Sequence, residues 1–508
     1  MTTAIRSLPT LNWDGRVLGF QLPWLALLPL LLIPILGTDA GALNTILFAT
    51  ELCLLAAGVK RSCWIPAALL LSEMSASNYL FGGSTNGGGF QISARLVIAC
   101  ISVPVLVPHI ASRLEVGHKA KWTIALGCGF VFVTTFVNSL YAGEDFVLQF
   151  LRYIGVGLYY LILIPICIRN RDDLRDLGVL VLGFAAFSGL VGIFQHLHEH
   201  YGTPLWQTVP NPGAPGESYT TWEERLLGLS ENPIQAGNIL MVVGLIALGA
   251  VLVTPMSANT KRLIGCVLLM MAGAAYFTFT RSWAIAMAPA LLSMALFYKG
   301  KYKKEFWLII IILAGGMWYW SDLKTNRYTA TEDDGSAAAR PVLWSLGLDI
   351  AYDHPWLGVG HDAFLKLSPE YETQSLLDNK NAQDVVGKYA VHNDMINVWL
   401  SWGFIALILY VLLAIAIGKN FYDALTRAVD PLLRGLALGG LAALLGYEVN
   451  SQFHNLLDST LTLWILGGLS LALLKLSPQA PPPPRPKTPF APVKLVRDAK
   501  DVWEECVV

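Results

Sequence analysis

Charged residues are scarce in this chain of 508 residues: they make up 14% of it, whereas hydrophobic residues make up 54%. A soluble domain usually carries about 25% charged residues, so the composition excludes an ordinary water-exposed fold. The mean hydropathy of +0.52 points the same way. Most of this chain is therefore expected to face lipid or the interior of a membrane protein.

Two further patterns are missing. The apolar runs are continuous and show no ten-residue segments of alternating polarity, so a transmembrane β-barrel is excluded and helices are expected. No small-residue cleavage site follows the first apolar run. We therefore expect that run to be retained as a membrane span and not removed as a signal peptide.

The chain instead contains a series of apolar runs, each long enough to cross roughly 30 Å of hydrocarbon with some tilt. We predict an all-α, polytopic integral membrane protein with about fourteen transmembrane helices. The predicted spans are 18–37, 43–58, 64–80, 94–110, 122–141, 146–168, 177–196, 234–254, 263–278, 282–298, 305–320, 395–418, 432–449 and 456–475.

Basic residues occupy alternate connections between these spans. The basic connections carry Lys60 and Arg61; Arg113, Lys119 and Lys121; Arg169, Arg171 and Arg175; Lys261 and Arg262; Lys299, Lys301, Lys303 and Lys304; and Lys419, Arg427 and Arg434. The short opposing connections 38–42, 81–91, 142–145 and 450–455 contain no Lys or Arg. Because positive charge collects on the cytoplasmic side, we predict a bacterial inner-membrane protein with both termini in the cytoplasm.

This topology divides the chain into six segments. They are N-terminal transmembrane helices (1–196), a periplasmic loop (197–233), further transmembrane helices (234–320), a large periplasmic loop (321–394), C-terminal transmembrane helices (395–475) and a proline-rich cytoplasmic tail (476–508). The seven cysteines fall in predicted spans or on the cytoplasmic side, so no disulfide is expected. The two long loops are too long to be simple connectors, and we expect an ordered periplasmic cap that contains short helices.

One such helix is predicted to start with Pro341 in its first turn and to run to about Tyr352. Leu343, Leu346 and Ile350 share one stripe of this helix. His354-Pro355 is expected to end it, and Gly358-Val-Gly360 is expected to form a turn.

Five arginines depart from the cytoplasmic pattern. Arg95 and Arg152 lie about one turn inside the outer ends of two spans, whereas Arg225, Arg281 and Arg340 lie on outer loops or turns. An arginine at membrane depth is costly unless it is paired or hydrated, and its planar fork suits phosphate. We predict a diphosphate-binding pocket that faces the periplasm. The structural alternative pairs Arg152 with Glu144 or Asp145, and Arg340 with Asp333 or Asp334.

His392 directly precedes the span that begins near Met395, and Asn393 or Asp394 is expected to cap that helix. A histidine in this place can be neutral and accept a proton from a hydroxyl nucleophile. The alternative is an interfacial residue that only forms hydrogen bonds. Glu51 and Glu73, inside two spans, are expected to form hydrogen bonds within the bundle in protonated form or to line a cavity.

Short motifs recur on the predicted outer face. They are Arg225 with Gly228 and Asn232-Pro233, Thr280-Arg-Ser282, Arg340-Pro-Val-Leu-Trp344, His354-Pro-Trp-Leu-Gly-Val-Gly360 with Phe364, Val391-His-Asn393 and Trp402-Gly-Phe404. In combination they resemble the C-terminal signature of the O-antigen ligase and O-antigen polymerase superfamily. The resemblance covers roughly residues 225–475; the first two hundred residues match only in hydrophobic pattern and topology.

The resemblance implies a metal-independent glycosyltransferase that uses an undecaprenyl-diphosphate-linked saccharide as donor on the periplasmic side. It places the essential histidine of the family at His392 and the phosphate-binding arginines at Arg225, Arg281 and Arg340, while Arg95 and Arg152 rest on topology alone. No cofactor, metal ion or nucleic-acid partner is expected. The expected partners are the lipid bilayer, the lipid-linked glycan donor and a hydroxyl acceptor.

Several alternatives stay open. The acceptor is another lipid-linked repeat unit, a lipid A core or a protein hydroxyl, which correspond to a polymerase, a ligase and an O-oligosaccharyltransferase. A transporter or flippase of a lipid-linked saccharide would also need intramembrane arginines. Against transport, the chain shows no duplicated halves, and its polar residues concentrate on one face and not at the midplane.

Overall fold

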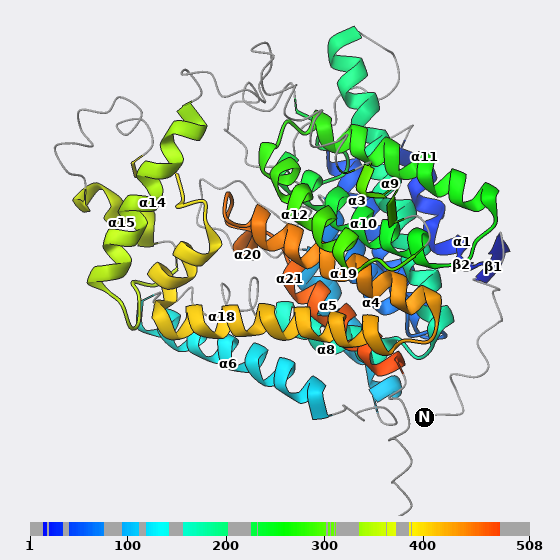
Figure 1. Ribbon diagram of the computed structural model, residues 1–508, viewed down its shortest axis with the longest axis horizontal. Helices are drawn as coiled ribbons and strands as arrows, with labels where there is room; N and C mark the ends of the chain where they lie inside the picture. The colour runs from blue at the N-terminus through cyan, green and yellow to red at the C-terminus, as the bar shows by residue number, and fades with distance from the viewer. Residues whose placement is uncertain are drawn as a thin grey trace, which may run out of the picture.

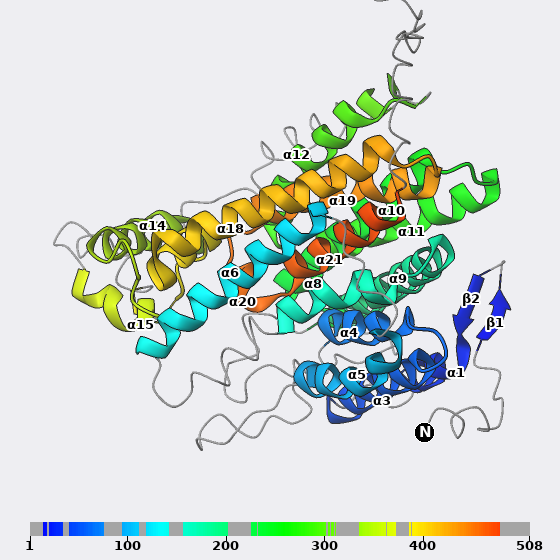
Figure 2. The same cartoon turned by 90° about the horizontal axis from the view of Figure 1, so that it is seen from below.

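The computed structural model describes residues 14–17, 20–33, 40–75, 94–110, 118–141, 156–201, 225–230, 232–300, 303–304, 306–308, 310, 335–361, 363–371, 386–387 and 389–477. Within these residues the protein is a bundle of helices, many of them side by side along one direction, with one small hairpin at an end (Figures 1 and 2). The fold is that of an all-α polytopic membrane protein, as the composition predicts.

The helices of the bundle follow the predicted spans in order. They are α3 (Ala40–Gly58), α4 (Trp64–Met74), α5 (Ala94–Ile110), α6 (His118–Tyr141), α8 (Val156–Cys167), α9 (Arg171–Tyr201), α10 (Pro233–Val253), α11 (Ala258–Phe277), α12 (Arg281–Phe297), α18 (Asp394–Arg427), α19 (Pro431–Asn450) and α21 (Thr462–Leu476). Six described helices are long and apolar enough to cross a membrane, and the others are shorter. The total of about fourteen therefore stays a prediction, and most of the span expected at 305–320 lies outside the described residues.

The first predicted span, 18–37, is not a continuous helix. Strands β1 (Asp14–Val17) and β2 (Phe20–Pro23) form an antiparallel hairpin, followed by α1 (Trp24–Leu27) and the 3₁₀ helix η2 (Leu28–Leu32). Pro23 and Pro29 lack the backbone donors that a continuous helix needs, and each marks a boundary between these elements. The expectation of a helix from residue 18 is therefore wrong for its first part.

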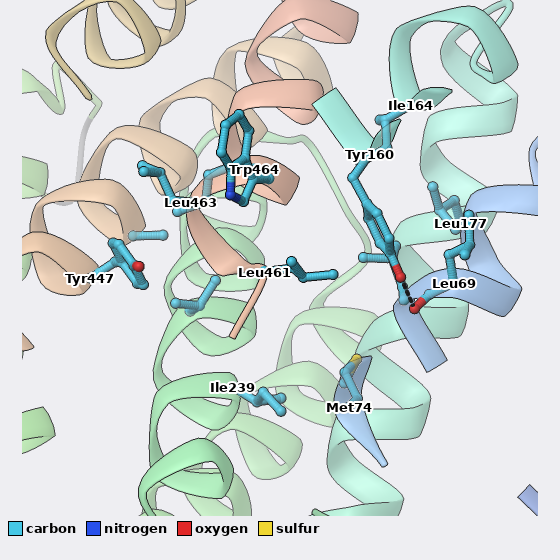
Figure 3. Packing of buried hydrophobic residues seen from close by; sticks show 14 of the residues in the cluster. Leu69, Met74, Tyr160, Ile164, Leu177, Ile239, Tyr447, Leu461, Leu463 and Trp464 are labelled. Carbon is cyan, nitrogen blue, oxygen red and sulfur yellow. Dashed lines mark hydrogen bonds between the residues drawn. The ribbon is translucent and has the colours of Figure 1, made fainter. Parts of the chain in front are cut away.

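Aromatic and aliphatic side chains fill the centre of the bundle. Figure 3 shows Trp464 of α21, Tyr160 of α8 and their apolar neighbours, with the Tyr160 hydroxyl donating a hydrogen bond to the carbonyl oxygen of Leu69 at 2.5 Å. Glycines permit a close approach between α10 and α19: a Cβ built on Gly249 of α10 would lie 2.4 Å from the Gly435 carbonyl oxygen of α19. Small residues allow such close backbone approach between membrane helices.

At one end of the bundle, connections that share the predicted cytoplasmic side are joined by ion pairs. Arg61 contacts Asp173 and Asp176, each at 2.9 Å. Arg171 contacts Asp430 at 2.6 Å, and Lys475 donates to the Pro165 carbonyl oxygen at 2.9 Å. The ion pairs of Arg61 and Arg171 join basic connections that were predicted to lie on the same side of the membrane, so they agree with the predicted alternation of sides along the chain.

At the end where α18 begins, α14 (Gly335–Asp353), α15 (Ala363–Leu367) and the 3₁₀ helix η8 (Ser368–Tyr371) form a cap (Figures 1 and 2). Leu343, Leu346 and Ile350 of α14 are buried in one hydrophobic cluster, which agrees with the predicted stripe. The helix starts at Gly335 and not at Pro341, so the prediction of Pro341 in the first turn is wrong. It ends before His354 as expected, because Pro355 disfavours helical geometry for the residue that precedes it.

The cap crosses α18 where that helix is interrupted. Gly403 has φ +83°, and a Cβ on it would lie 1.9 Å from the Trp356 carbonyl oxygen, so only glycine fits this crossing. Gly358 and Gly360 have positive φ, which confirms the predicted turn. A second break separates α20 (Leu456–Ser459) from α21 at the extended residue Thr460, so the predicted span 456–475 is not one continuous helix.

Candidate functional site

The beginning of α18 is tied to the connection between α19 and α20. The Asn393 side chain accepts a hydrogen bond from the Ile396 N–H at 3.1 Å, which confirms Asn393 as the predicted helix cap. Its backbone N–H donates to Asn455 Oδ1 at 3.0 Å, and the Asp394 carboxylate accepts from the Leu457 N–H. These bonds fix the residue immediately before the cap, His392, against residues 451–457.

His392 has a strained backbone. Its φ is +53°, in the left-handed region that residues other than glycine rarely occupy. Such a conformation costs about 1–3 kcal/mol and persists only where the surrounding contacts enforce it. The hydrogen bonds of Asn393 and Asp394 supply that enforcement and hold the backbone from which the imidazole extends.

A second histidine lies beside the first. The ring centroids of His392 and His454 are 6.1 Å apart, with the planes nearly perpendicular. His454 Nε2 lies 2.8 Å from the Ser282 hydroxyl oxygen, in the first turn of α12. Sequence reasoning missed His454, and it quoted Ser282 only within the Thr280-Arg-Ser282 motif, without a role. The signal for His454 was present, because the connection 450–455 was predicted to lie on the same face as His392.

Arg340 enters the cluster from the cap. Its guanidinium carbon lies 5.9 Å from the centre of the Phe453 ring, and the Trp344 ring lies 6.3 Å from the same ring. Phe453 directly precedes His454. The cation–π contact of Arg340 and the tilted ring contact of Trp344 thus bring α14 against the loop that carries the second histidine.

Arg225 reaches the same region from the loop before α10. Its Nε donates to the Thr278 carbonyl oxygen and its Nη2 to Thr280 Oγ1, both at 2.9 Å. Gln195 clamps the loop by bonding both the N–H and the carbonyl of Gly228 at 3.1 Å. Arg281 follows Thr280 as the first residue of α12, so two predicted arginines lie at the start of this helix.

Burial and positive charge keep both histidines neutral. Burial, followed by the charge of Arg340, lowers the pKa of His392 to about 4. Burial holds the pKa of His454 well below its usual range, and electrostatic interactions with Arg340, His392 and Arg225 lower this pKa further. The structure therefore brings Arg225, Arg340 and the predicted His392 into one electrostatic neighbourhood, and both imidazoles are unprotonated near neutral pH.

Two predicted arginines are placed differently. Arg95 forms a buried ion pair with Glu73, with Nη2 and Oε2 3.0 Å apart, and the other Glu73 oxygen accepts from the Leu461 N–H at 2.7 Å. Glu73 is thus an ion-pair acceptor inside the bundle, while Glu51 accepts a bond from Ser75 at 3.3 Å. Arg152 lies outside the described residues, as do Glu144, Asp145, Asp333 and Asp334.

The fold and this cluster define a multi-pass membrane protein with a candidate site of partly buried arginines and two histidines at one end. A family model described as O-antigen ligase matches residues 266–411, from within α11 to the middle of α18. This match supports the assignment of the chain to the O-antigen ligase and polymerase superfamily, as the motifs predicted, and so indicates a membrane enzyme of that type. Arg281, Arg340 and His392 lie inside the matched region. No curated protein matches the chain.

Proposed function

We propose that the protein is a glycosyltransferase of surface polysaccharide assembly, in lipopolysaccharide or exopolysaccharide biosynthesis. It moves a saccharide from an undecaprenyl-diphosphate donor to an acceptor hydroxyl at the periplasmic face of the inner membrane. The observation that carries this proposal is the convergence of Arg225, Arg340 and a neutral His392 from three distant segments. Guanidinium groups match a diphosphate and a neutral imidazole matches a hydroxyl, so the cluster suits both partners of a glycosyl transfer.

The arginines serve the donor. Negative charge grows on the diphosphate as its bond to the anomeric carbon breaks, and prepositioned guanidinium groups stabilise that charge in a poorly hydrated site. Arg225, Arg281 and Arg340 are proposed to make these contacts. Arg95 and Arg152 are proposed as further members of the set on topology alone, with Arg95 the weaker contributor because Glu73 already balances its charge.

His392 serves the acceptor. The acceptor hydroxyl attacks the anomeric carbon from the face opposite the diphosphate and gives its proton to the imidazole. One carbon–oxygen bond forms while the bond to the diphosphate breaks, so a single displacement inverts the anomeric configuration. A base that is already neutral at the working pH can accept this proton without first losing one of its own.

The decisive experiment uses purified protein in detergent with an undecaprenyl-diphosphate-linked glycan and candidate acceptors. Transfer without any ion gradient, and unaffected by EDTA, is the expected result. A protein that moves the lipid-linked glycan across vesicle membranes but transfers nothing would instead be a flippase. Activity that EDTA abolishes and Mg²⁺ restores would show that the arginines do not act alone on the leaving group.

The acceptor is tested in a deletion strain. Short lipid-linked units left in the mutant would identify a polymerase, whereas complete polymer stranded on undecaprenyl would identify a ligase. Loss of glycan from proteins, with both polysaccharides intact, would identify an O-oligosaccharyltransferase.

The proposed orientation is tested by labelling introduced cysteines. Cysteines at Ser336 and at the exposed Glu370, both in the cap, should react with a membrane-impermeant thiol reagent in intact spheroplasts; Ser368 is fully buried, so Glu370 is used in its place. A cysteine at Ser257, between α10 and α11, should react only after lysis. The reverse pattern would put the arginines and His392 in the cytoplasm and end the proposal.

A further inference from the structure

The hydrogen bond between His454 and Ser282 has no part in the transfer described above. Nε2 of His454 makes this bond at 2.8 Å, and both side chains are buried. The second ring nitrogen, Nδ1, is buried as well, and no described residue forms a hydrogen bond with it. A buried polar atom without a partner costs free energy, and in a native site it is commonly completed by a ligand or water.

The surroundings of this ring favour an anionic ligand. Arg225 and Arg340 both act on His454 through their positive charge, and Arg340 lies over Phe453, the residue next to it. The ring of His392 is also a neighbour, with 6.1 Å between the two ring centroids. An anion drawn to the two guanidinium groups therefore comes within reach of the imidazole of His454.

The Ser282 bond decides what His454 offers to that anion. A neutral imidazole carries one proton, on either Nε2 or Nδ1. If Nε2 accepts the proton of the Ser282 hydroxyl, then Nδ1 carries the N–H and can donate it. An anionic oxygen is repelled by a bare nitrogen lone pair and attracted by an N–H, so binding of an anion selects this tautomer.

We propose that Nδ1–H of His454 donates a hydrogen bond to a diphosphate oxygen of the bound glycan carrier, while Ser282 holds the ring in that tautomer. This inference rests on the proposed function and adds a contact that no sequence motif marked. His454 touches the diphosphate, and Ser282 is a positioning residue that acts through it. The contact strengthens as charge develops on the leaving group, so it contributes to donor affinity and to turnover.

Two amide substitutions separate the two ring nitrogens. The amide nitrogen of Asn takes roughly the place of Nδ1, and the longer Gln places its amide near Nε2. His454→Asn should therefore keep donor affinity and kcat/KM within about threefold of the native values, while His454→Gln should lower both about 10- to 100-fold, as for the loss of one hydrogen bond to a charged group. Undecaprenyl diphosphate without sugar, used as a competitive inhibitor, reports affinity separately from turnover.

His361 supplies a matched control. It lies near the same end and stacks on Trp402, with ring centroids 5.9 Å apart. Replacement by Asn and by Gln at this position should give the same affinity for undecaprenyl diphosphate. Ser282→Ala removes the hydroxyl that selects the tautomer and should weaken inhibition by undecaprenyl diphosphate several-fold, while adding little to His454→Asn.

Equal effects of His454→Asn and His454→Gln, or a better result for Gln, would show that the histidine only supports α12 and would overturn the inference. Should the His454 variants fail to fold, Ser282→Ala carries the test, and unchanged inhibition by undecaprenyl diphosphate in that variant would also overturn it. Failure of the proposed function looks different. In that case native protein transfers no glycan, yet it still binds undecaprenyl diphosphate with the predicted Asn and Gln difference.

Discussion

The groups that surround the arginines differ between the two ends of this molecule. At one end Arg61 lies between two carboxylates, Asp173 and Asp176, each 2.9 Å away. At the other, Arg225 is held by a carbonyl and a hydroxyl, and Arg340 lies over an aromatic ring. The first arrangement pairs the charge with two carboxylates, whereas in the second Arg340 acts on His392 and His454, and Arg225 acts on His454.

This difference shows how to distinguish a structural arginine from a candidate binding arginine. Opposite charges 2.9 Å apart hold two helices or loops together and need no ligand. Positive charge that acts on neutral imidazoles, in contrast, is favourable for an anionic ligand, because guanidinium groups form charge-assisted hydrogen bonds with phosphate. Arg95 is likewise paired with a carboxylate, Glu73, inside the bundle, and for this reason it is the weaker proposed contributor to donor binding.

The largest effect is expected for His392→Ala. Loss of general-base help should lower turnover by at least about 10²-fold with little change in donor affinity, since the histidine acts on the acceptor. Steady-state kinetics with a lipid-linked donor, together with a separate binding measurement, check this. A variant that binds donor much more weakly but turns over bound donor at the native rate would make His392 a phosphate ligand and not the base.

Arg340→Ala comes next. It should lower donor affinity and turnover together, about 10- to 100-fold in kcat/KM, because it removes a charge-assisted contact that strengthens as the leaving group charges. Arg340→Lys should restore only part of the loss, because an ammonium lacks the planar fork. Full recovery with Lys would mean that the positive charge alone matters at this position and that the planar guanidinium is not needed.

Arg61→Ala tests the other end. It removes the charge-assisted bonds of Arg61 to Asp173 and Asp176 and should destabilise the protein by about 2 kcal/mol, because Asp176 keeps its pair with Arg175 and Asp173 keeps the bond from the Arg169 N–H. The matched control is Arg171→Ala, whose side chain is 46% exposed in its pair with Asp430 and should cost at most about 1 kcal/mol. Thermal unfolding in detergent measures both. Donor affinity of folded Arg61→Ala protein should equal that of the native protein, and a fall would contradict the division between the two ends.

The smallest effect is expected from mild acid. With the pKa of His392 at about 4, roughly 90% of this imidazole stays neutral at pH 5, against about 3% at its usual pKa of 6.5. The kcat/KM profile should therefore change by less than about twofold between pH 7 and pH 5. Removing the positive neighbour in Arg340→Gln should raise this pKa and move the acid limb to higher pH. An unmoved limb would mean that Arg340 does not act on His392.

Local patterns in the chain were enough to predict much of this arrangement. Hydrophobic run length predicted most of the helices, and charge alternation predicted which loops meet. The pair Asn393-Asp394 before Met395 predicted a helix cap, which the structure assigns to Asn393. Each of these signals acts within one turn, one loop or one membrane span. Their physical causes, which are the thickness of the bilayer, the distribution of charge across it and the free N–H groups of a helix start, do not depend on the rest of the fold.

Other features arise only when distant segments pack together. Ser282 and His454 are 172 residues apart in the chain, and no spacing rule predicts a bond between them. Glu73 and Arg95 lie in consecutive helices, yet Glu73 also binds the backbone of Leu461 across the bundle. The interruption at Gly403 exists because the Trp356 carbonyl crosses there. Side-chain partners and helix breaks of this kind depend on which surfaces come within hydrogen-bonding distance, and that is settled only by the packing of the whole bundle.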